Sequence, residues 1–456
     1  MGTPRSAWWP NCWHTVADRP HLLYVAWGFP PARSGGVYRA WATANEFARQ
    51  GWRVTVLTAP RETFLMSTGI DESLERAVDP GIEVVRVPFE SASYANDIRA
   101  WSRWRAHAPE LWNGWRGLRE RRDFPEAKYG AWRAGLEAAT LSIHEKDPVD
   151  LVIGTANPHV DFTAGFALHE AAGVPYVMDY RDAWQLDVFS GRRLTGAGSR
   201  EAKWEKRLIA SAHQVWFVNQ PILDWHAELH PDAAGRFRVV ANGFDLDVAL
   251  PERDATLPRT SLRFGYIGTI SGHVPVRELV AGWRLARQRS ALVAASTMEL
   301  YGYLDHAGTA SPAVLKAMDE FEANSITFHG AVSKGDIAAV YSTFDALLLV
   351  LGTGRYVTSG KVYEYTATGL PIASIHDPGN AASTVLADYP AWRPSQSLSV
   401  EDVASTIVAA AELAALQTDA ERAAAANWAE RYRRVNQLLP AIADLTATAV
   451  RGGGSV

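Results

Sequence analysis

The sequence predicts an α/β protein with two Rossmann-like domains that face each other across a cleft. Its 456 residues are enough for two or three domains with separate cores. Strand and helix patterns alternate along the chain, which implies parallel sheets. The alternation breaks near residues 246–261 and then begins again. Two parallel sheets placed in this way border a cleft with their carboxyl ends, where ligands usually bind.

The first α/β run starts with a short apolar segment at residues 21–27 that ends at Gly28, a pattern typical of a buried strand that enters a loop. Apolar and small residues then recur at helical spacing over residues 37–50, and Gly51 supplies a stop. Further strands are predicted at 54–57, 151–153, 176–178, 215–218 and 239–240, with a helix at 162–172.

The second run repeats this alternation after the break. Strands are predicted at 262–267, 298–303, 326–328, 346–350 and 371–374, with helices at 276–287, 336–342 and 362–367 and an Ala-rich helical region at 401–447. We therefore divide the chain into an extension at 1–20, a first domain at 21–248, a second domain at 249–420, and a final helix and tail at 421–456.

Composition excludes several classes of protein. A formal net charge of −5 gives no overall attraction to nucleic acid or to anionic membranes. The single cysteine, Cys12, cannot form an intramolecular disulfide, so nothing requires an oxidising compartment. No apolar run approaches the ~18–20 residues of a membrane span, and the N-terminus lacks the layout of a signal peptide. We expect a cytoplasmic protein that does not bind nucleic acid.

Each run opens with a glycine-rich strand end. Gly35 and Gly36 lie between the first strand and its helix, and Gly268 and Thr269 occupy the matching place in the second run. Backbone N–H groups at such a position can bind an anion, although a tight turn without a ligand explains the glycines as well. Neither site has the three-glycine dinucleotide motif followed by an acid about twenty residues later, which disfavours a dehydrogenase.

Polar residues follow two predicted strands of the first domain. Arg181, Asp182 and Trp184 come after the strand at 176–178, and His159 follows the neighbouring strand. Side chains at the carboxyl ends of parallel strands normally line the cleft. Two other interpretations stay open, because Arg181 could pair with a neighbouring aspartate and His159 could be an ordinary hydrogen-bonding residue.

Lys361 and Glu364 form the sharpest candidate of the second domain. They are three residues apart near a predicted helix start that follows Gly360, so they share one side of the helix. The chain has only seven lysines, and a lysine at a helix N-terminus is suited to contact phosphate. Glu364 could accept hydrogen bonds from ribose hydroxyls. The alternative is an exposed ion pair that contributes only ~0.3–0.5 kcal/mol.

Taken in order, these segments resemble the retaining family-4 glycosyltransferases of the GT-B fold. The resemblance spans about residues 21–375. It rests on Gly28-Phe-Pro-Pro31 with Gly35-Gly36, Asp150 to Gly154 with Asn157-Pro-His159, Asp179 to Trp184, Asn242-Gly243-Phe244-Asp245, Gly265-Tyr-Ile-Gly268, Thr327-Phe-His329-Gly330, and Lys361-Val-Tyr-Glu364 with Gly369-Leu-Pro371.

The resemblance implies a donor side in the second domain. Glu364 matches the second acid of the Glu-x7-Glu element that contacts the donor ribose, whereas the first acid is replaced by Tyr356. Lys361 would face the diphosphate, and Arg277 stands in for the family's basic pair after the first strand of this domain. The donor set that follows from the motifs is Gly35, Gly36, Gly268, Thr269, Arg277, His329, Gly330, Lys361 and Glu364.

The resemblance also implies the reaction. A sugar would pass from a nucleotide-diphosphate sugar to a hydroxyl acceptor with retention, by front-face attack, in glycan, glycolipid or natural-product biosynthesis. His159 would lie beside the donor sugar, Arg181 and Asp182 would complete the catalytic set, and no metal or other cofactor is needed. A non-hydrolysing nucleotide-sugar epimerase of similar fold and a catalytically silent homologue remain alternatives. The helix near residues 426–439 is expected to return to the first domain.

Tryptophan is concentrated on the acceptor side. Fifteen of the 18 tryptophans precede residue 230, and the segment 97–140 combines several of them with a net charge of +3, from nine basic and six acidic residues. We predict that Trp112, Trp115 and Trp184 face an acceptor that is a small molecule, a glycan or a lipid-linked saccharide. The segment could also contact the inner membrane surface peripherally, or simply cover the sheet as a helical pair.

Overall fold

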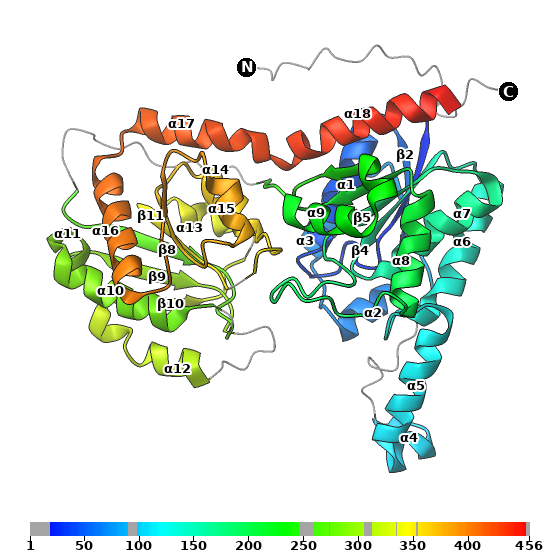
Figure 1. The fold of residues 1–456 in the computed structure, drawn as a ribbon, viewed down its shortest axis with the longest axis horizontal. Helices are drawn as coiled ribbons and strands as arrows, with labels where there is room; N and C mark the ends of the chain where they lie inside the picture. The colour runs from blue at the N-terminus through cyan, green and yellow to red at the C-terminus, as the bar shows by residue number, and fades with distance from the viewer. Residues whose placement is uncertain are drawn as a thin grey trace.

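The computed structural model describes residues 19–89, 98–245, 248, 259–272, 274–304, 312–333, 335–352 and 354–452. These form two parallel sheets with helices on their faces, in two lobes that are joined along one side by the C-terminal helices (Figure 1). The predicted fold class, two Rossmann-like α/β domains, is confirmed. The extension at 1–18 and most of the predicted linker, residues 246–247 and 249–258, lie outside the described residues.

The first sheet has the strand order β3-β2-β1-β4-β5-β6-β7, and every neighbouring pair is parallel. Its strands are β1 (His21–Val25), β2 (Arg53–Thr58), β3 (Ile82–Arg86), β4 (Leu151–Ala156), β5 (Tyr176–Tyr180), β6 (Gln214–Phe217) and β7 (Phe237–Val239). Side chains alternate across the sheet: Leu22 and Tyr24 join one core while Leu23 and Val25 join another. Both faces are therefore buried, as parallel sheets require.

Helices cover both faces of the first sheet. The helices of this domain are α1 (Val37–Arg49), α2 (Arg61–Met66), α3 (Glu72–Arg76), α4 (Arg103–His107), α5 (Pro109–Asp123), α6 (Arg133–Lys146), α7 (Phe162–Ala172), α8 (Arg200–Ser211) and α9 (Gln220–Leu229), of which α4 and α5 do not lie on the sheet. Leu136 of α6 and Phe162 of α7 pack on one face, and Phe47 of α1 packs on the other. The sequence did not predict β3, α8 or α9, because their apolar residues are few and interrupted by charged ones.

The second sheet has the order β10-β9-β8-β11-β12-β13 and is also parallel. Its strands are β8 (Arg263–Ile267), β9 (Thr297–Tyr301), β10 (Ile326–Gly330), β11 (Ala346–Val350), β12 (Ile372–Ile375) and β13 (Trp392–Pro394). The helices of this region are α10 (Val276–Arg289), α11 (Ala291–Ala294), α12 (Pro312–Met318), α13 (Ile337–Tyr341), α14 (Gly360–Ala367), α15 (Ala381–Leu386) and α16 (Val400–Leu416). The fully buried β11 lies at the centre, where both cores of this domain meet.

The C-terminal helices connect the two lobes. α17 (Asp419–Ala429) packs on α14, and α18 (Arg434–Gly452) packs on α1 of the first domain (Figure 1). Leu438, Ile442 and Leu445 of α18 are buried in the core that α1 forms with the sheet. The Ala-rich region thus divides into α16, α17 and α18, and its last part returns to the first domain.

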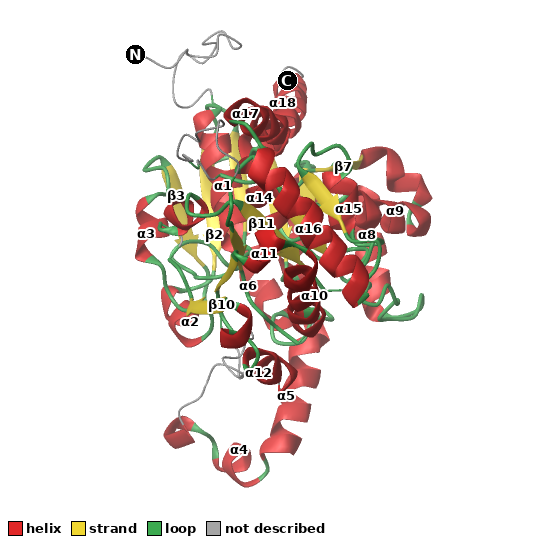
Figure 2. Cartoon of the chain, turned by 90° about the vertical axis from the view of Figure 1, so that its left-hand side faces the viewer, coloured by secondary structure: helices red, strands yellow, loops and turns green. Residues whose placement is uncertain are grey.

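α4 and α5 project away from the first domain as an arm (Figures 1 and 2). At its base, α5 meets the turn Gly130–Trp132 and continues into Phe124, which is fully buried in the first core. The arm is the most protruding part of the described fold (Figures 1 and 2).

In the part of the chain that the structure describes, no helix is long and apolar enough to cross a bilayer.

Candidate active site

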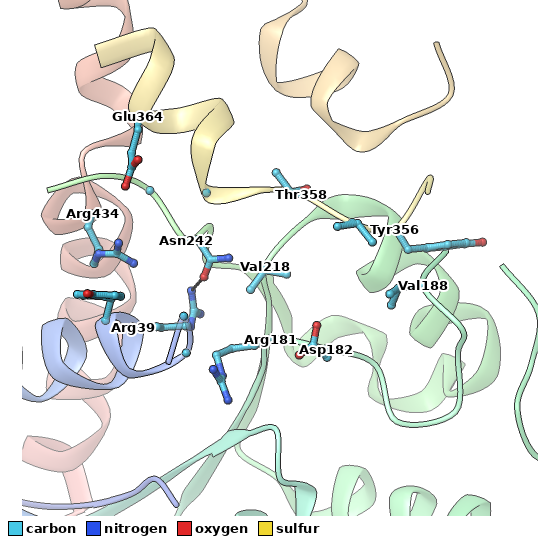
Figure 3. Close-up of a pocket in the computed structure, with 16 residues that line it drawn as sticks. Arg39, Arg181, Asp182, Val188, Val218, Asn242, Tyr356, Thr358, Glu364 and Arg434 are labelled. Atoms are coloured by element: carbon cyan, nitrogen blue, oxygen red, sulfur yellow. Dashed lines mark hydrogen bonds between the residues drawn. The ribbon is translucent and has the colours of Figure 1, made fainter. Parts of the chain in front are cut away.

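A cavity of about 320 Å³ lies between the two domains, at the carboxyl ends of the strands (Figure 3). It is lined by Gly35, Gly36, Tyr38, Arg39, Arg181, Asp182, Val188, Val218, Asn242, Gly243, Tyr356, Val357, Thr358, Gly360, Glu364 and Arg434. The cavity brings together five of the predicted site residues, namely Gly35, Gly36, Arg181, Asp182 and Glu364. They come from loops and helices of both domains.

A buried ion pair forms the floor on the side of the first domain. Arg39 of α1 donates one bifurcated hydrogen bond from Nε to both oxygens of the Asp179 carboxylate, at 2.8 and 3.1 Å, and a second hydrogen bond from Nη2 at 2.6 Å. Arg39 is 3% exposed and Asp179 is fully buried, while Thr155 donates to the same carboxylate at 3.0 Å. Burial disfavours the charged guanidinium, but the charge and hydrogen bonds of Asp179 outweigh this and raise the pKa of Arg39.

The same arginine fixes the loop that follows β7. Arg39 Nη1 donates to the carbonyl of Val240 at 2.9 Å and lies 3.4 Å from Oδ1 of Asn242. Gly243 has φ +62°, and a Cβ there would lie 2.5 Å from the carbonyl oxygen of Tyr432. The chain that enters α18 passes so close to this loop that only glycine fits at position 243.

Arg434, the first residue of α18, is also held at the cavity wall. Its backbone N–H donates to the carbonyl of Phe244 at 2.8 Å, and its Nε donates to Asp245 at 2.8 Å. Asp245, the first acid of the sequence Asp245-Leu-Asp247, therefore orients a cationic side chain that lines the cavity.

Arg181 lines the cavity, and its guanidinium lies against Gly36. It pairs with neither neighbouring aspartate: Nε donates to the carbonyl of Ala156 at 2.7 Å and Nη2 donates to the carbonyl of Asn157 at 2.6 Å. A Cβ on Gly36 would lie 1.3 Å from Nη1 of Arg181, whereas a Cβ on Gly35 would meet nothing within 4 Å. Gly36 thus leaves space for the guanidinium of Arg181, and the close approach of that side chain explains why this position is a glycine.

His159 is held in place beside the cavity instead of lining it. Glu126 Oε1 accepts from the backbone N–H of His159 at 2.9 Å and lies 3.2 Å from Nδ1, and Nε2 lies 3.3 Å from the carbonyl oxygen of Asp182. The imidazole stacks on Trp184 with centroids 5.1 Å apart, and Trp184 stacks in turn on Phe124 at 5.0 Å. His159 is only 5% exposed.

The second domain contributes α14, whose N-terminus borders the cavity. Ser359 caps the helix by accepting from the N–H of Lys361 at 3.4 Å, and Gly360 lines the cavity. Glu364 lies on the next turn, where Tyr341 donates to its Oε2 at 3.4 Å. The positive end of a helix dipole and a carboxylate are therefore neighbours on one wall.

Lys361 reaches back behind this wall to the glycine turn after β8. Nζ donates to Tyr266 Oη at 2.8 Å and lies 4.3 Å from the centre of the Tyr266 ring. A Cβ on Gly268 would lie 2.1 Å from Nζ, so the predicted Gly268 and Lys361 do meet. Tyr266 donates to the carbonyl of Thr269 at 2.9 Å. Burial lowers the pKa of Lys361 to about 8, an effect that the charge of Glu364 partly opposes.

The loop before α14 ties the two domains together. Asn219, the N-cap of α9, donates from Nδ2 to the carbonyl of Tyr356 at 2.9 Å and to Thr358 Oγ1 at 3.0 Å. A Cβ on Gly191 would lie 3.3 Å from the ring of Tyr356, which also packs against the first core. Tyr356, the residue in place of the expected acid, therefore contacts the opposite domain.

Several residues that were predicted to bind the donor or the acceptor lie outside this cavity. Arg277, at the start of α10, has a 70% exposed side chain 3.8 Å from Glu278. His329 pairs with Glu299 at 2.6 Å and stacks on Tyr301, and the carbonyl of Gly330 accepts from Gly302. None of Arg277, His329, Gly330, Trp112 and Trp115 lines the cavity, and the two tryptophans lie on the projecting arm. Trp184 supports His159.

Sequence reasoning missed four residues that build the site: Arg39, Glu126, Asn219 and Arg434. Only Arg39 leaves a signal in the sequence, because it is a charged residue in the first turn of a helix whose buried positions are mostly small or apolar. Together, the cavity places the guanidinium groups of Arg181 and Arg434 and the N-terminus of α14 around one space, with the ammonium group of Lys361 behind it. Such a set can hold an anion, and the Glu364 carboxylate on the same wall is of a type that accepts from hydroxyl groups.

Residues 34–243 match the glycosyl transferase 4-like domain family. The chain carries a glycosyl transferase 4-like domain. It contains the glycine pair, Arg39, Asp179, Arg181 and Asp182, so the first-domain wall of the cavity belongs to it. No curated protein matches the sequence.

Solved structures resemble the whole chain and show the GT-B fold. Anabaena Alr3699/HepE, solved in complex with UDP, has a TM-score of 0.60 at 13% identity and covers 94% of this chain and 100% of its own. Sucrose-phosphate synthase from Thermosynechococcus elongatus has a TM-score of 0.57 at 16% identity, with 95% and 99% covered. A putative UDP-N-acetylglucosamine 2-epimerase from Listeria monocytogenes has a TM-score of 0.53 at 10% identity, with 93% and 96% covered. The glycosyl transferase 4-like domain is thus the first half of a two-domain GT-B chain.

The buried ion pair predicts a large stability effect in the glycosyl transferase 4-like domain. Asp179→Ala leaves Arg39 buried without its carboxylate, and we expect it to lower the free energy of unfolding by about 3–5 kcal/mol. Urea denaturation followed by tryptophan fluorescence measures this, since most tryptophans lie in this domain. The matched control is Glu170→Ala, which breaks the exposed pair with Arg207 in the same domain and should cost less than about 1 kcal/mol. Equal losses would contradict the structural role of Asp179.

Proposed function

We propose that the protein is a glycosyltransferase that moves a sugar from a nucleotide-diphosphate sugar to a hydroxyl acceptor, with retention of configuration and without a metal. One observation carries the proposal: the cavity between the domains combines the Gly36–Arg181 wall of the glycosyl transferase 4-like domain with the N-terminus of α14 and Glu364, and the buried Lys361 lies behind the second wall. The two walls supply positive charge for a diphosphate and a carboxylate that can accept hydrogen bonds from sugar hydroxyls.

The second domain would hold the nucleotide. The N-terminus of α14 and the Lys361 ammonium would face the diphosphate, while the Glu364 carboxylate would accept hydrogen bonds from ribose hydroxyls. Complexes of Anabaena Alr3699/HepE with UDP and with UDP-glucose support this class of donor for the GT-B fold. Tyr356, which stands where the family has an acid, would leave the donor sugar with one carboxylate contact fewer.

The chemistry asks mainly for charge stabilisation. The bond between the anomeric carbon and the diphosphate oxygen breaks, and the acceptor oxygen bonds to the same face of that carbon. The acceptor proton passes to the departing phosphate oxygen. Lys361, Arg181 and the helix N-terminus would stabilise the negative charge that develops on the diphosphate, which is the largest effect available to such a site.

The first domain would place the acceptor. Asp182 lines the cavity and could orient an acceptor hydroxyl or the sugar. His159 would lie beside the donor sugar, behind the cavity wall, with Glu126 as a positioning residue that holds Nδ1 and the backbone N–H. The acceptor itself is proposed as a small molecule, a glycan or a lipid-linked saccharide that approaches between Val188 and Tyr356.

A donor assay tests the function. We expect calorimetry to detect one nucleoside diphosphate from a panel of UDP, GDP and ADP, and the corresponding nucleotide sugar to release nucleotide when an acceptor is added. Conversion of UDP-N-acetylglucosamine to another sugar without an acceptor would instead support an epimerase, the activity suggested by the Listeria neighbour. Binding of a nucleotide sugar without any turnover would support the catalytically silent homologue, and binding of no nucleotide and no nucleotide sugar would overturn the proposal.

Lys361 predicts a pH dependence of donor affinity. Its pKa of about 8 means that the ammonium is charged below pH 8 and neutral above it, so diphosphate affinity should fall as the pH rises through 8. Lys361→Met should weaken binding at pH 7 by about tenfold or more (~1.4 kcal/mol) and abolish this pH step. Calorimetric titration from pH 6.5 to pH 9.5 measures both, with exposed Lys206→Met on α8 as the control. An unchanged pH profile in Lys361→Met would remove the lysine from the donor site.

The glycine pair predicts unequal effects of two neighbouring substitutions. Gly36→Ala forces Arg181 out of its position and should lower turnover by about tenfold or more, because small displacements in an active site are costly. Gly35→Ala adds a methyl group in open space and should cause a clearly smaller loss. Steady-state kinetics with the donor identified above measures both. Equal losses would show that the guanidinium position is not what Gly36 provides.

A further inference from the structure

The arm formed by residues 98–123 exposes a stripe of large apolar side chains. Leu111 is 72% exposed, Trp115 43% and Leu118 74%. Residues 111, 115 and 118 follow the i, i+4, i+7 spacing of one helix face, so the three side chains form one continuous stripe along α5. Trp104 of α4, which is 46% exposed, extends the stripe, because its ring packs on Trp115 with centroids 5.1 Å apart.

The two leucines of the stripe are not needed to build the arm. Its internal contacts use aromatic rings: Trp104 packs on Trp115, and Arg105 is held between the rings of Trp101 and Trp112, at 4.0 and 4.5 Å. At the base, Arg200 of α8 donates to the backbone carbonyls of residues 121 and 122, at 2.8 and 2.6 Å. The arm is therefore fixed to the domain while the leucines of the stripe point away from it. An exposed apolar surface of this kind marks an interaction site.

Positive charge surrounds the stripe. The exposed charged residues of the arm include Arg99, Arg103, Arg119, Arg121 and Arg122 against only Glu110 and Asp123. The remaining acid, Glu120, is 6% exposed. Its carboxylate accepts hydrogen bonds from Arg116 Nε at 3.2 Å and from the backbone N–H of residue 128. Arg122 continues the stripe spacing at i+11, and the guanidinium of Arg119 lies 5.6 Å from the Trp115 ring. Arg119 and Arg122 thus share one surface with the apolar stripe.

We propose that this arm docks on an anionic bilayer surface. The leucines and the two tryptophans would enter the interface between headgroups and acyl chains, and the arginines would contact lipid phosphates. The arm projects beyond the rest of the first domain in two perpendicular views, so it can reach a flat surface (Figures 1 and 2).

Charge favours lipid over a second copy of the chain. A twofold contact would place the same face of both arms together, and the arginines that flank the stripe would then oppose one another. A lipid phosphate surface instead complements them. The overall net charge of −5 does not conflict with this, because the positive charge is local to the arm.

Vesicle flotation of the full chain tests the proposal. The probes are vesicles of pure phosphatidylcholine and of phosphatidylcholine with 30% phosphatidylglycerol, each at low salt and at 0.5 M salt. We expect binding to the anionic vesicles only, and weaker binding at 0.5 M salt, where charges are screened within about 5 Å. Leu111→Gln with Leu118→Gln should lower the partition coefficient by about tenfold or more, because both leucines lose their insertion into the interface.

Matched variants keep the test decisive. Leu194→Gln with Leu416→Gln changes two leucines that are 58% and 71% exposed outside the arm, and it should bind vesicles like the unmodified protein. Circular dichroism should show the same melting temperature for both double variants, since no packed side chain is altered. Absence of flotation, or flotation that the arm variant does not reduce, would overturn the proposal. So would a concentration-dependent dimer in light scattering that the arm variant abolishes, because the stripe would then be covered by a second copy. None of these outcomes depends on the glycosyltransferase activity.

Discussion

The buried pair of Arg39 and Asp179 is the constraint on which the site depends. It joins the first helix to the end of β5, and the same guanidinium holds the loop after β7 through the carbonyl of Val240. Asp179 lies two residues before Arg181, near the end of the strand that leads into the turn with Arg181 and Asp182, so its position fixes theirs. Removing two charges from water is costly, and the arrangement is stable because the carboxylate receives hydrogen bonds from both Arg39 and Thr155.

The second wall of the cavity depends on contacts between the domains. Asn219 holds the loop that leads into α14, and α18 crosses to the first domain and buries Leu438 beside the first helix. These contacts set the distance between the helix N-terminus and Arg181. A site divided between two domains can respond to a ligand by small domain movements, and these inter-domain hydrogen bonds are the ones that such a movement would change.

The tryptophans of the first domain serve different purposes. Trp184 orients His159 by stacking, Trp101 and Trp112 hold Arg105 inside the arm, and Trp104 and Trp115 lie on its exposed face. The abundance of tryptophan in this half suggested an aromatic acceptor surface, but the cavity contains no tryptophan among its lining residues. Composition identifies which half is unusual, whereas position decides what each ring does.

The sequence by itself determined the α/β class, the two runs of parallel strands, and the cavity residues Gly35, Gly36, Arg181, Asp182 and Glu364, because periodicity and strand-end chemistry are local properties. Only the tertiary structure decided the rest. Arg39 lies 140 residues from Asp179, and the side chain of Arg434 lies 189 residues from Asp245, so no local pattern connects them. Likewise, whether the apolar stripe on α5 is buried or exposed depends on which other segments of the fold pack against it. Partners distant in sequence are chosen by packing, which the order of residues specifies only through the complete fold.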